Sequence, residues 1–320
     1  MSEAAAYLNA HPRVTKTLQF TLGAVVIAFC AWAVRNEWSK AGSRIADANL
    51  YWLGVSLLVV AAYYLVFILG WIRMLTAWDI RISYRVALQA EMVSMLAKYV
   101  PGGVWTPAAR AVALRRNAGI TDTPTVLASS LVEAGLSAIS GVIVFVASLA
   151  WVHGVNTPLP LLIAFGLLLA IVMHPRIFRP VSRRILKPFG AEVEPLPFGL
   201  TLGLLLFYCV TWIIGGFALY FLLLSVHANP GVSTVAFLGG TSAVGAIVAV
   251  LAVFSPSGLG FREGAMYGLL LAVVDKDPAL SAALLNRLAI TVVEVALFGV
   301  GVWLTLRAKN ATRDTAADRR

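Results

Sequence analysis

The amino-acid sequence predicts an all-α polytopic membrane protein with six spans and two re-entrant (or short-span) helical hairpins in an inverted repeat. The first observation is composition, because 60% of the 320 residues are hydrophobic and only 12% are charged. A soluble domain carries about 25% charged residues, so the excess apolar surface here must face lipid. This composition excludes a soluble enzyme, a nucleic-acid-binding module and a disulfide-stapled secreted domain. The other two observations are apolar runs of spanning length and two similar interruptions.

Six apolar runs approach or exceed the roughly 20 residues that a helix needs to cross a bilayer. They are residues 18–34, 50–72, 125–152, 158–174, 198–226 and 280–306. The first run follows a long segment that contains Glu3, Arg13 and Lys16. We therefore expect an uncleaved first span rather than a removed signal peptide.

The distribution of lysine and arginine sets the expected orientation, because basic loops stay on the cytoplasmic side. Residues 175–197 and the tail 307–320 are rich in basic side chains, whereas residues 153–157 and 227–231 contain none. This pattern places both termini in the cytoplasm and the chain in the inner membrane; only the loop 35–49 is ambiguous. The expected parts are a cytoplasmic segment 1–17, a single transmembrane domain 18–306 and a basic tail 307–320.

Two further apolar regions are broken by proline and glycine. Residues 84–116 contain PGGVWTP at 101–107, and residues 232–274 contain SPSGLGFREG at 255–264. Each region must begin and end on one side of the membrane, so each is a pair of short spans or a re-entrant hairpin. Re-entry is favoured for the first, because residues 84–99 are too few to span and include Arg85, Glu91 and Lys98. Proline ends a helix and glycine turns the chain, as such a tip requires.

The two interruptions also indicate an internal repeat. Pro101 and Pro256 are 155 residues apart, and each begins a proline, small residue, glycine, aliphatic, aromatic pattern. A shift of 155 residues superimposes the flanking runs, giving halves at about 50–152 and 198–306 with opposite orientations. Inverted repeats with broken helices are typical of transporters. The alternative is a coincidental register among similar apolar helices.

The stretch LAKYVPGGVWTPAARAVALRRNAGI, then Glu133, and later SPSGLGFREG resemble the lysylphosphatidylglycerol synthetase/flippase transmembrane region family. The resemblance covers residues 18–306. It implies movement of lipid between leaflets, as this region does for aminoacylated phosphatidylglycerol in bifunctional members. Those members add a soluble domain that takes the aminoacyl group from tRNA, and only residues 307–320 follow here, so we expect transport and no lipid synthesis. Other stand-alone relatives are associated with hopanoid, archaeal glycolipid and polyprenyl-linked glycan pathways, which leaves the cargo open.

Ionisable residues within the membrane segments are the main candidate site residues, because such groups are costly there and usually functional. They are Glu91, Lys98, Arg110, Glu133, Arg262, Glu263, Arg287 and Glu294. We expect Lys98, Arg110, Arg262 and Arg287 to attract a lipid phosphate in a midplane cavity. Glu133, Glu263 and Glu294 would neutralise these cations in the empty cavity or take up protons. The alternative is that the same residues pair with one another and lock the hairpins.

The other expected binding residues lie at the two tips. They are Pro101, Gly102, Gly103 and Trp105 in the first tip, and Ser255, Gly258, Gly260 and Phe261 in the second. Backbone N–H groups at the start of the helix after Gly260 are expected to bind an anionic headgroup. Trp105 and Phe261 either cap the cavity or pack.

No metal site, cofactor or catalytic constellation is expected. The four histidines are scattered without i, i+4 spacing, and SPSGLGFREG lacks the lysine of a phosphate-binding nucleotide loop. The leading hypothesis is therefore not an enzyme but a flippase for an anionic or headgroup-modified lipid, either an aminoacylated phospholipid or a polyprenyl-linked glycolipid. Two alternatives remain: a membrane enzyme acting on a lipid phosphate with Glu133 or Glu263 as general base, and a scaffold for a glycosyltransferase. The expected partners are membrane lipids and a lipid-modifying synthase or glycosyltransferase, without nucleic acid; the oligomeric state is left open.

Overall fold

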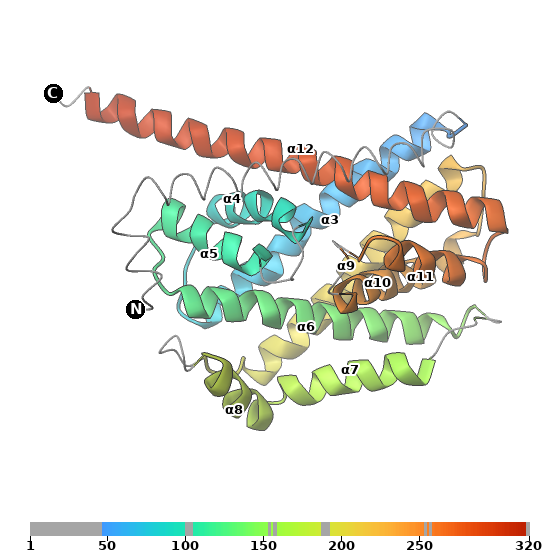
Figure 1. Ribbon diagram of the computed structural model, residues 1–320, viewed down its shortest axis with the longest axis horizontal. Helices are drawn as coiled ribbons and strands as arrows, with labels where there is room; N and C mark the ends of the chain where they lie inside the picture. Colours follow the sequence, from blue (N-terminus) through green and yellow to red (C-terminus); the bar gives the residue numbers. More distant parts are fainter. Residues whose placement is uncertain are drawn as a thin grey trace.

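The computed structural model describes residues 47–99, 105–152, 155, 159–186, 193–252, 255 and 258–317. Within these ranges all regular secondary structure is helical (Figure 1), which confirms the expected all-α class. The first expected span, residues 18–34, lies outside the described residues.

Five segments are long and apolar enough to cross a membrane. They are α3 (Leu50–Ala77), α6 (Thr123–Ser148), α9 (Phe198–Ser225), the segment Val232–Leu251 that contains α10 (Val235–Leu251), and the part Lys276–Trp303 of α12 (Lys276–Ala317). The 28 residues of α3 extend about 42 Å, more than the roughly 30 Å of hydrocarbon in a bilayer. Polar side chains fix where two of these helices begin, because a helix leaves its first N–H groups unpaired. The Asn49 side chain accepts from the Tyr51 N–H at 3.0 Å, and Asp122 accepts from the Thr125 N–H at 3.2 Å.

The expected span at 158–174 differs from the structure. It forms α7 (Leu159–Met173), a helix of only 15 residues, and the chain then bends by 78° into α8 (Pro175–Leu186). Pro175 has no N–H with which to continue the hydrogen bonding of α7. Among the described residues, a sixth candidate span therefore exists only if this bent pair is counted as one crossing.

In each broken region two helices on either side of the interruption pack against each other, and each such pair keeps the name hairpin. The first consists of α4 (Tyr84–Ser94), the 3₁₀ helix η1 (Met95–Tyr99) and α5 (Trp105–Ala118), with α4 packed along α5. The second consists of η3 (Val232–Thr234), α10 and α11 (Phe261–Leu270), with α11 packed along α10. The arms of the second hairpin are unequal, because Val232–Leu251 has 20 residues and α11 has 10. Only the shorter arm matches the expectation of a re-entrant segment.

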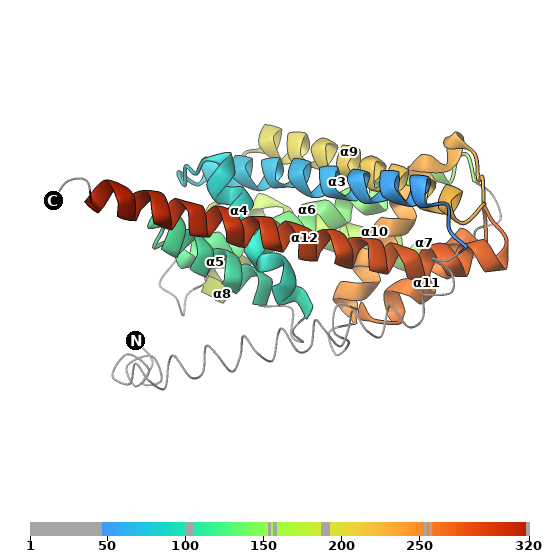
Figure 2. The same cartoon turned by 90° about the horizontal axis from the view of Figure 1, so that it is seen from above.

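The two hairpins lie along α12 and meet near its middle (Figure 2). Met92 of α4 packs against Gly301, and Lys98 of η1 is paired with Glu294. The guanidinium of Arg262, at the start of α11, lies 3.4 Å from the side chain of Asn286. The first hairpin thus runs down α12 towards lower residue numbers, and α11 starts there and continues in the same direction. Lys98 and Arg262 thus contact residues of α12 that are eight positions apart, about 12 Å of helix.

Each hairpin belongs to a different apolar core. The first contributes Ala90, Ala111 and Leu114 to a core that also contains the fully buried Trp71 and Tyr208. The second contributes to a core at the other end of the molecule, whose members include Phe237, Met266, Leu270, Phe145 and Leu222. Arg110 and Glu133 contact Trp71 and Tyr208 of the first core.

Close backbone contacts hold α10 in the bundle. A Cβ atom on Gly239 would lie 2.4 Å from the carbonyl oxygen of Trp212, and one on Gly216 would lie 2.2 Å from that of Val235. Only glycine permits this approach of α9 to α10. Small residues at helix contacts are the usual device in lipid, where apolar side chains gain little by leaving the solvent.

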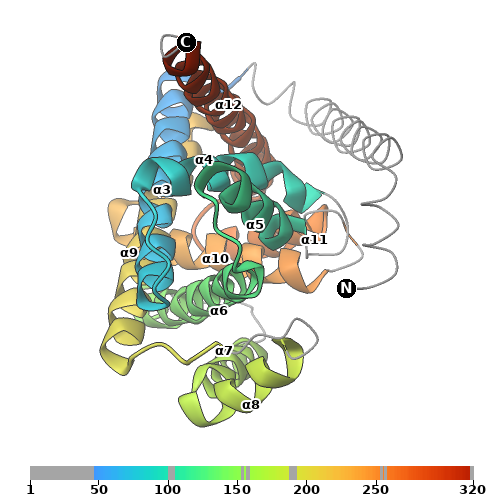
Figure 3. The same cartoon turned by 90° about the vertical axis from the view of Figure 1, so that its left-hand side faces the viewer.

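Arginine residues gather at one end of the bundle. The end of α3, the start of α4, the end of α5 and all of α8 lie there (Figure 1), and Figure 3 looks onto this end. It carries Arg81, Arg85, Arg115, Arg116 and the arginines of α8. The opposite end carries Asp47, Asp275, Lys276 and Asp277. The uneven distribution of basic residues among the loops therefore corresponds to a difference in charge between the two ends of the folded protein.

Candidate functional site

A buried ion-pair triad fastens the first hairpin to α6. Arg110 of α5 pairs with Glu91 of α4 and with Glu133 of α6, and the three side chains are at most 10% exposed. The Tyr208 hydroxyl donates to Glu133 at 3.4 Å, and the Arg110 guanidinium lies 4.7 Å from the centre of the Trp71 ring. A buried charge is tolerated when it is paired and hydrogen-bonded, so this arrangement stabilises the packing of α4, α5 and α6. It places two carboxylates against one arginine.

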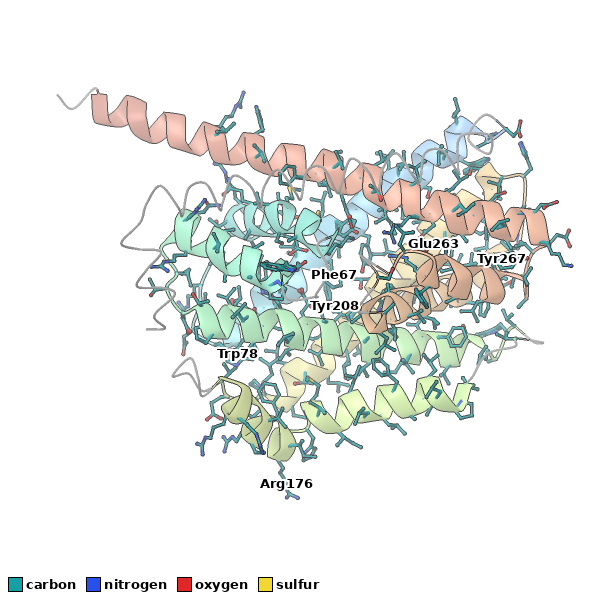
Figure 4. All side chains as sticks on the ribbon, viewed as in Figure 1. Phe67, Trp78, Arg176, Tyr208, Glu263 and Tyr267 are labelled. Atoms are coloured by element: carbon teal, nitrogen blue, oxygen red, sulfur yellow. The ribbon has the colours of Figure 1, made fainter. Side chains whose placement is uncertain are left out.

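An ion pair also joins the second hairpin to α12, but the positions of the two charges are exchanged. Here the carboxylate is on the second arm of the hairpin and the arginine is on the long helix: Arg287 donates to Glu263 at 3.3 Å. The other oxygen of Glu263 accepts from the Gly260 N–H at 2.6 Å, which caps the start of α11. The Glu263 carboxylate therefore occupies the anion site that was expected at this helix start. Figure 4 shows Glu263 beside α12.

A third pair lies between the two tips. Lys98 of η1 pairs with Glu294 of α12, and the hydroxyl of Tyr64 of α3 donates to the same carboxylate oxygen. The side chain of Glu294 is fully buried, whereas that of Lys98 is 32% exposed. Lys98 is therefore reachable from the cavity that it lines.

Arg262 is held differently from the other arginines of the bundle. Its guanidinium donates to the side-chain oxygen of Asn286 at 3.4 Å, so its side-chain partner is an amide rather than a carboxylate. Across the parts of the chain that the structure describes, no carboxylate lies within ion-pair distance of Arg262. Arg262, Arg287 and Lys98 thus form a cluster of three cations with two carboxylates, Glu263 and Glu294.

A cavity of about 210 Å³ lies against Arg262 and Lys98. Its polar wall also includes Tyr63, Tyr64, Ser242 and Asn286, and its apolar wall consists of small or aliphatic residues of α3, α9 and α12 together with Trp212. The hydroxyl of Ser242 is buried and makes no hydrogen bond. The cavity therefore offers two cations and several hydroxyl or amide groups beside an apolar surface.

The structure brings some of the expected site residues together and separates others. Lys98 and Arg262 line the cavity, whereas Arg110 and Glu133 belong to the buried triad, and Glu263 and Arg287 hold the second hairpin. Pro101, Gly102 and Gly103 lie outside the described residues. Trp105 is the first residue of α5, and Phe261 is the first residue of α11. Gly258 and Gly260 both have positive φ. The Ser255 hydroxyl donates to the Leu259 carbonyl at 3.0 Å.

The spacing of charges within single helices did not predict their partners. Glu91 and Lys98 are seven residues apart, as are Arg287 and Glu294, a spacing that would place each pair on one face of a continuous helix. The structure pairs each of the four with a residue of another element, because η1 interrupts the first helix and the two hairpins supply the partners. The interpretation that these residues lock the hairpins agrees with this geometry.

Sequence reasoning missed the uncharged half of the cavity. Tyr63, Tyr64, Trp212, Ser242 and Asn286 were not singled out, although all line it. One signal was present: Tyr63 and Tyr64 lie in the middle of an apolar run, far from the span ends where aromatic anchors belong. Asn286, next to Arg287 within the last span, was a second such signal.

The comparisons with known proteins agree with the architecture. Residues 19–298 match the family described as the lysylphosphatidylglycerol synthase TM region. No curated protein matches the chain.

Proposed function

The chain belongs to the lysylphosphatidylglycerol synthase TM region family and is an integral membrane protein, and from this premise we propose that it is a lipid flippase rather than an enzyme. The family is a membrane domain associated with lipid modification or transport. In our proposal an anionic or headgroup-modified lipid passes its polar headgroup through the cavity while its tails stay in the surrounding lipid. The basic end of the bundle faces the cytoplasm, in keeping with the positive-inside rule.

The observation that carries the proposal is the state of Arg262. This cation faces a cavity of about 210 Å³ beside Lys98 and has only an amide as its side-chain partner. A charge at membrane depth is costly, so an arginine held in this way is suited to an anionic oxygen that arrives from outside the chain. Planar guanidinium groups bind phosphate through paired hydrogen bonds. A lipid phosphate has the required charge and geometry.

The internal arrangement supports movement between leaflets. The second arm of each hairpin begins with an aromatic residue, Trp105 or Phe261, and each is tied to the long helix that follows by one arginine–glutamate pair. We interpret this as the inverted repeat that the sequence predicted. Inverted repeats let a transporter open its central site alternately to the two sides.

The test is exchange of a fluorescent phosphatidylglycerol between the leaflets of proteoliposomes that contain the full chain. We expect Arg262→Gln to slow exchange about tenfold, since a charge-assisted hydrogen bond contributes roughly 1.5–3 kcal/mol, and Arg262→Lys to retain much of the rate. The matched control is Arg85→Gln, which removes one exposed arginine outside the cavity and should leave the rate unchanged. Wild-type exchange no faster than in empty liposomes would overturn the proposal, as would an Arg262→Gln variant as fast as wild type.

A further inference from the structure

The short helix α8 is the most amphipathic element of the described chain and lies apart from the cavity. Phe178 and Ser182 point inwards and are buried, and Phe178 joins the core that contains Trp71 and Leu136. The opposite face carries four exposed arginines: Arg176, Arg179, Arg183 and Arg184. Helical periodicity places Arg176, Arg179 and Arg183 on one face, because they are three, four and seven residues apart, and Arg184 is eight residues from Arg176.

The geometry of α7 sets the depth at which α8 lies. With 15 residues, α7 is about 22 Å long, shorter than the roughly 30 Å hydrocarbon core of a bilayer. The bend of 78° then turns α8 almost perpendicular to α7. If α7 runs along the membrane normal, α8 lies in the membrane plane near the boundary between hydrocarbon and headgroups.

Contacts with the segment that follows α8, and through it with the end of α3, hold α8 in this position. Arg179 pairs with Glu194 at 2.6 Å, and the backbone oxygen of Glu194 accepts from the Trp78 indole N–H at 2.8 Å. Trp78 follows the last residue of α3, where an interfacial tryptophan is expected. Figure 4 shows Arg176 pointing away from the bundle rather than along its long axis.

We propose that α8 is an interfacial helix whose arginine face binds the headgroups of anionic phospholipids around the protein. Amphipathic helices with basic polar faces are attracted to anionic lipid at the membrane interface, and because Phe178 packs on the protein core, the arginines of α8 supply this attraction. The occupant is a phospholipid surface because the charge is exposed along a whole helix face at headgroup level. The segment 175–197 has five basic and two acidic side chains, so it keeps a positive charge after its internal pairing.

Lipid binding by the whole protein tests this proposal. Native mass spectrometry of the full chain in mild detergent would compare titrations with phosphatidylglycerol and phosphatidylcholine. For the combined variant Arg176→Gln, Arg179→Gln, Arg184→Gln we expect about tenfold weaker binding of phosphatidylglycerol, because each basic residue near an anionic surface contributes roughly a fivefold affinity at most. Binding of phosphatidylcholine should not change.

A matched variant separates α8 from the general charge of this end. Arg81→Gln, Arg115→Gln, Arg116→Gln removes three exposed arginines from the same end of the bundle and should lose less than half as much affinity. An equal loss in this control would overturn the proposal, as would an unchanged affinity in the α8 variant. Arg262→Gln should leave this binding intact, so the outcome is independent of whether the cavity transports lipid.

The depth of α8 provides a second measurement. A spin label at Ile177→Cys, on the edge of the inward face, should be accessible to oxygen dissolved in the hydrocarbon of a bilayer. A label at Arg176→Cys should instead be accessible to a water-soluble nickel complex. If both labels were accessible only to the nickel complex, α8 would lie in water and the interfacial position would be overturned.

Discussion

Each hairpin is joined to the long helix that follows it by an arginine–glutamate ion pair. The arginine is on the hairpin in the first case and on the long helix in the second, and the arginines of the two clusters differ in how completely carboxylates neutralise them. In the first half, Arg110 is enclosed by Glu91 and Glu133, and the triad carries one surplus carboxylate. In the second half, Glu263 and Arg287 form the corresponding pair, and the neighbouring Arg262 is a surplus cation that faces the cavity. The first arginine is therefore neutralised by carboxylates of the chain, whereas the second ion pair lies beside a cation that faces the cavity.

This difference separates the roles of buried charges in the bundle. A fully paired charge fixes how two elements pack, and its removal is expected to affect folding. A charge with only an amide partner contributes less to packing and is available to a ligand. The four predictions that follow test this distinction, beginning with the largest expected effect.

Arg110→Met is expected to cause the largest loss of stability. The methionine fills a similar volume but leaves Glu91 and Glu133 as uncompensated buried carboxylates, and breaking a buried ion pair from one side costs about 3–5 kcal/mol. The measurement is thermal unfolding of the purified protein in detergent. Adding Glu91→Gln and Glu133→Gln should recover most of the stability, because no buried charge then remains. A triple variant as unstable as Arg110→Met would show that the arginine acts through packing against Trp71 instead.

Removing one carboxylate from each half sharpens the comparison. Glu263→Gln should cost about 2–3 kcal/mol, since it removes the ion pair with Arg287 and weakens the cap on Gly260. Glu91→Gln should cost less than about 1 kcal/mol, because Arg110 keeps Glu133 and the surplus negative charge disappears. Chemical unfolding of both variants in the same detergent measures the difference. Equal losses would contradict the inference that the first half contains a surplus carboxylate.

Gly239→Ala tests whether the second hairpin depends on backbone contact. The added Cβ would approach the Trp212 carbonyl oxygen to 2.4 Å, and overpacking of this kind costs about 1–3 kcal/mol. The matched control is Gly264→Ala in α11, where no atom lies within 4 Å of the new Cβ. The control should raise stability by about 0.5–1 kcal/mol, because alanine favours a helix more than glycine does. A stable Gly239→Ala variant would mean that α9 and α10 can separate at little cost.

The sequence predicted the parts of the fold that depend on local composition. Apolar runs marked α3, α6, α9 and α12, and the proline and glycine clusters marked where both hairpins turn. The shortness of α7 was missed because residues 158–174 are uniformly apolar, and only Pro175 distinguishes a span from a helix that turns aside.

The pairing of the charged residues was beyond sequence reasoning. Lys98 and Glu294 are 196 residues apart, and Tyr64 and Glu294 are 230 apart. Such contacts depend on which faces of packed helices meet, and periodicity within one helix does not determine this. The surplus charge of Arg262 likewise became visible only after every neighbouring carboxylate had been assigned a partner.

Asn286→Asp is the smallest change and tests the comparison most directly. It exchanges one amide for a carboxylate at the atom that accepts from Arg262, so the second half acquires the paired state of the first. Stability should stay within about 1 kcal/mol of wild type, because a new pair gains attraction while it adds a partly buried charge. Leaflet exchange of phosphatidylglycerol should fall about tenfold, equivalent to 1.4 kcal/mol, because the lipid phosphate must displace the new carboxylate. Asn286→Ala is the control: it removes a long neutral hydrogen bond, leaves Arg262 facing the cavity, and should alter exchange less than threefold. If Asn286→Asp exchanges phosphatidylglycerol as fast as Asn286→Ala does, the charge on Arg262 has no part in transport, and the cavity must act through its shape alone.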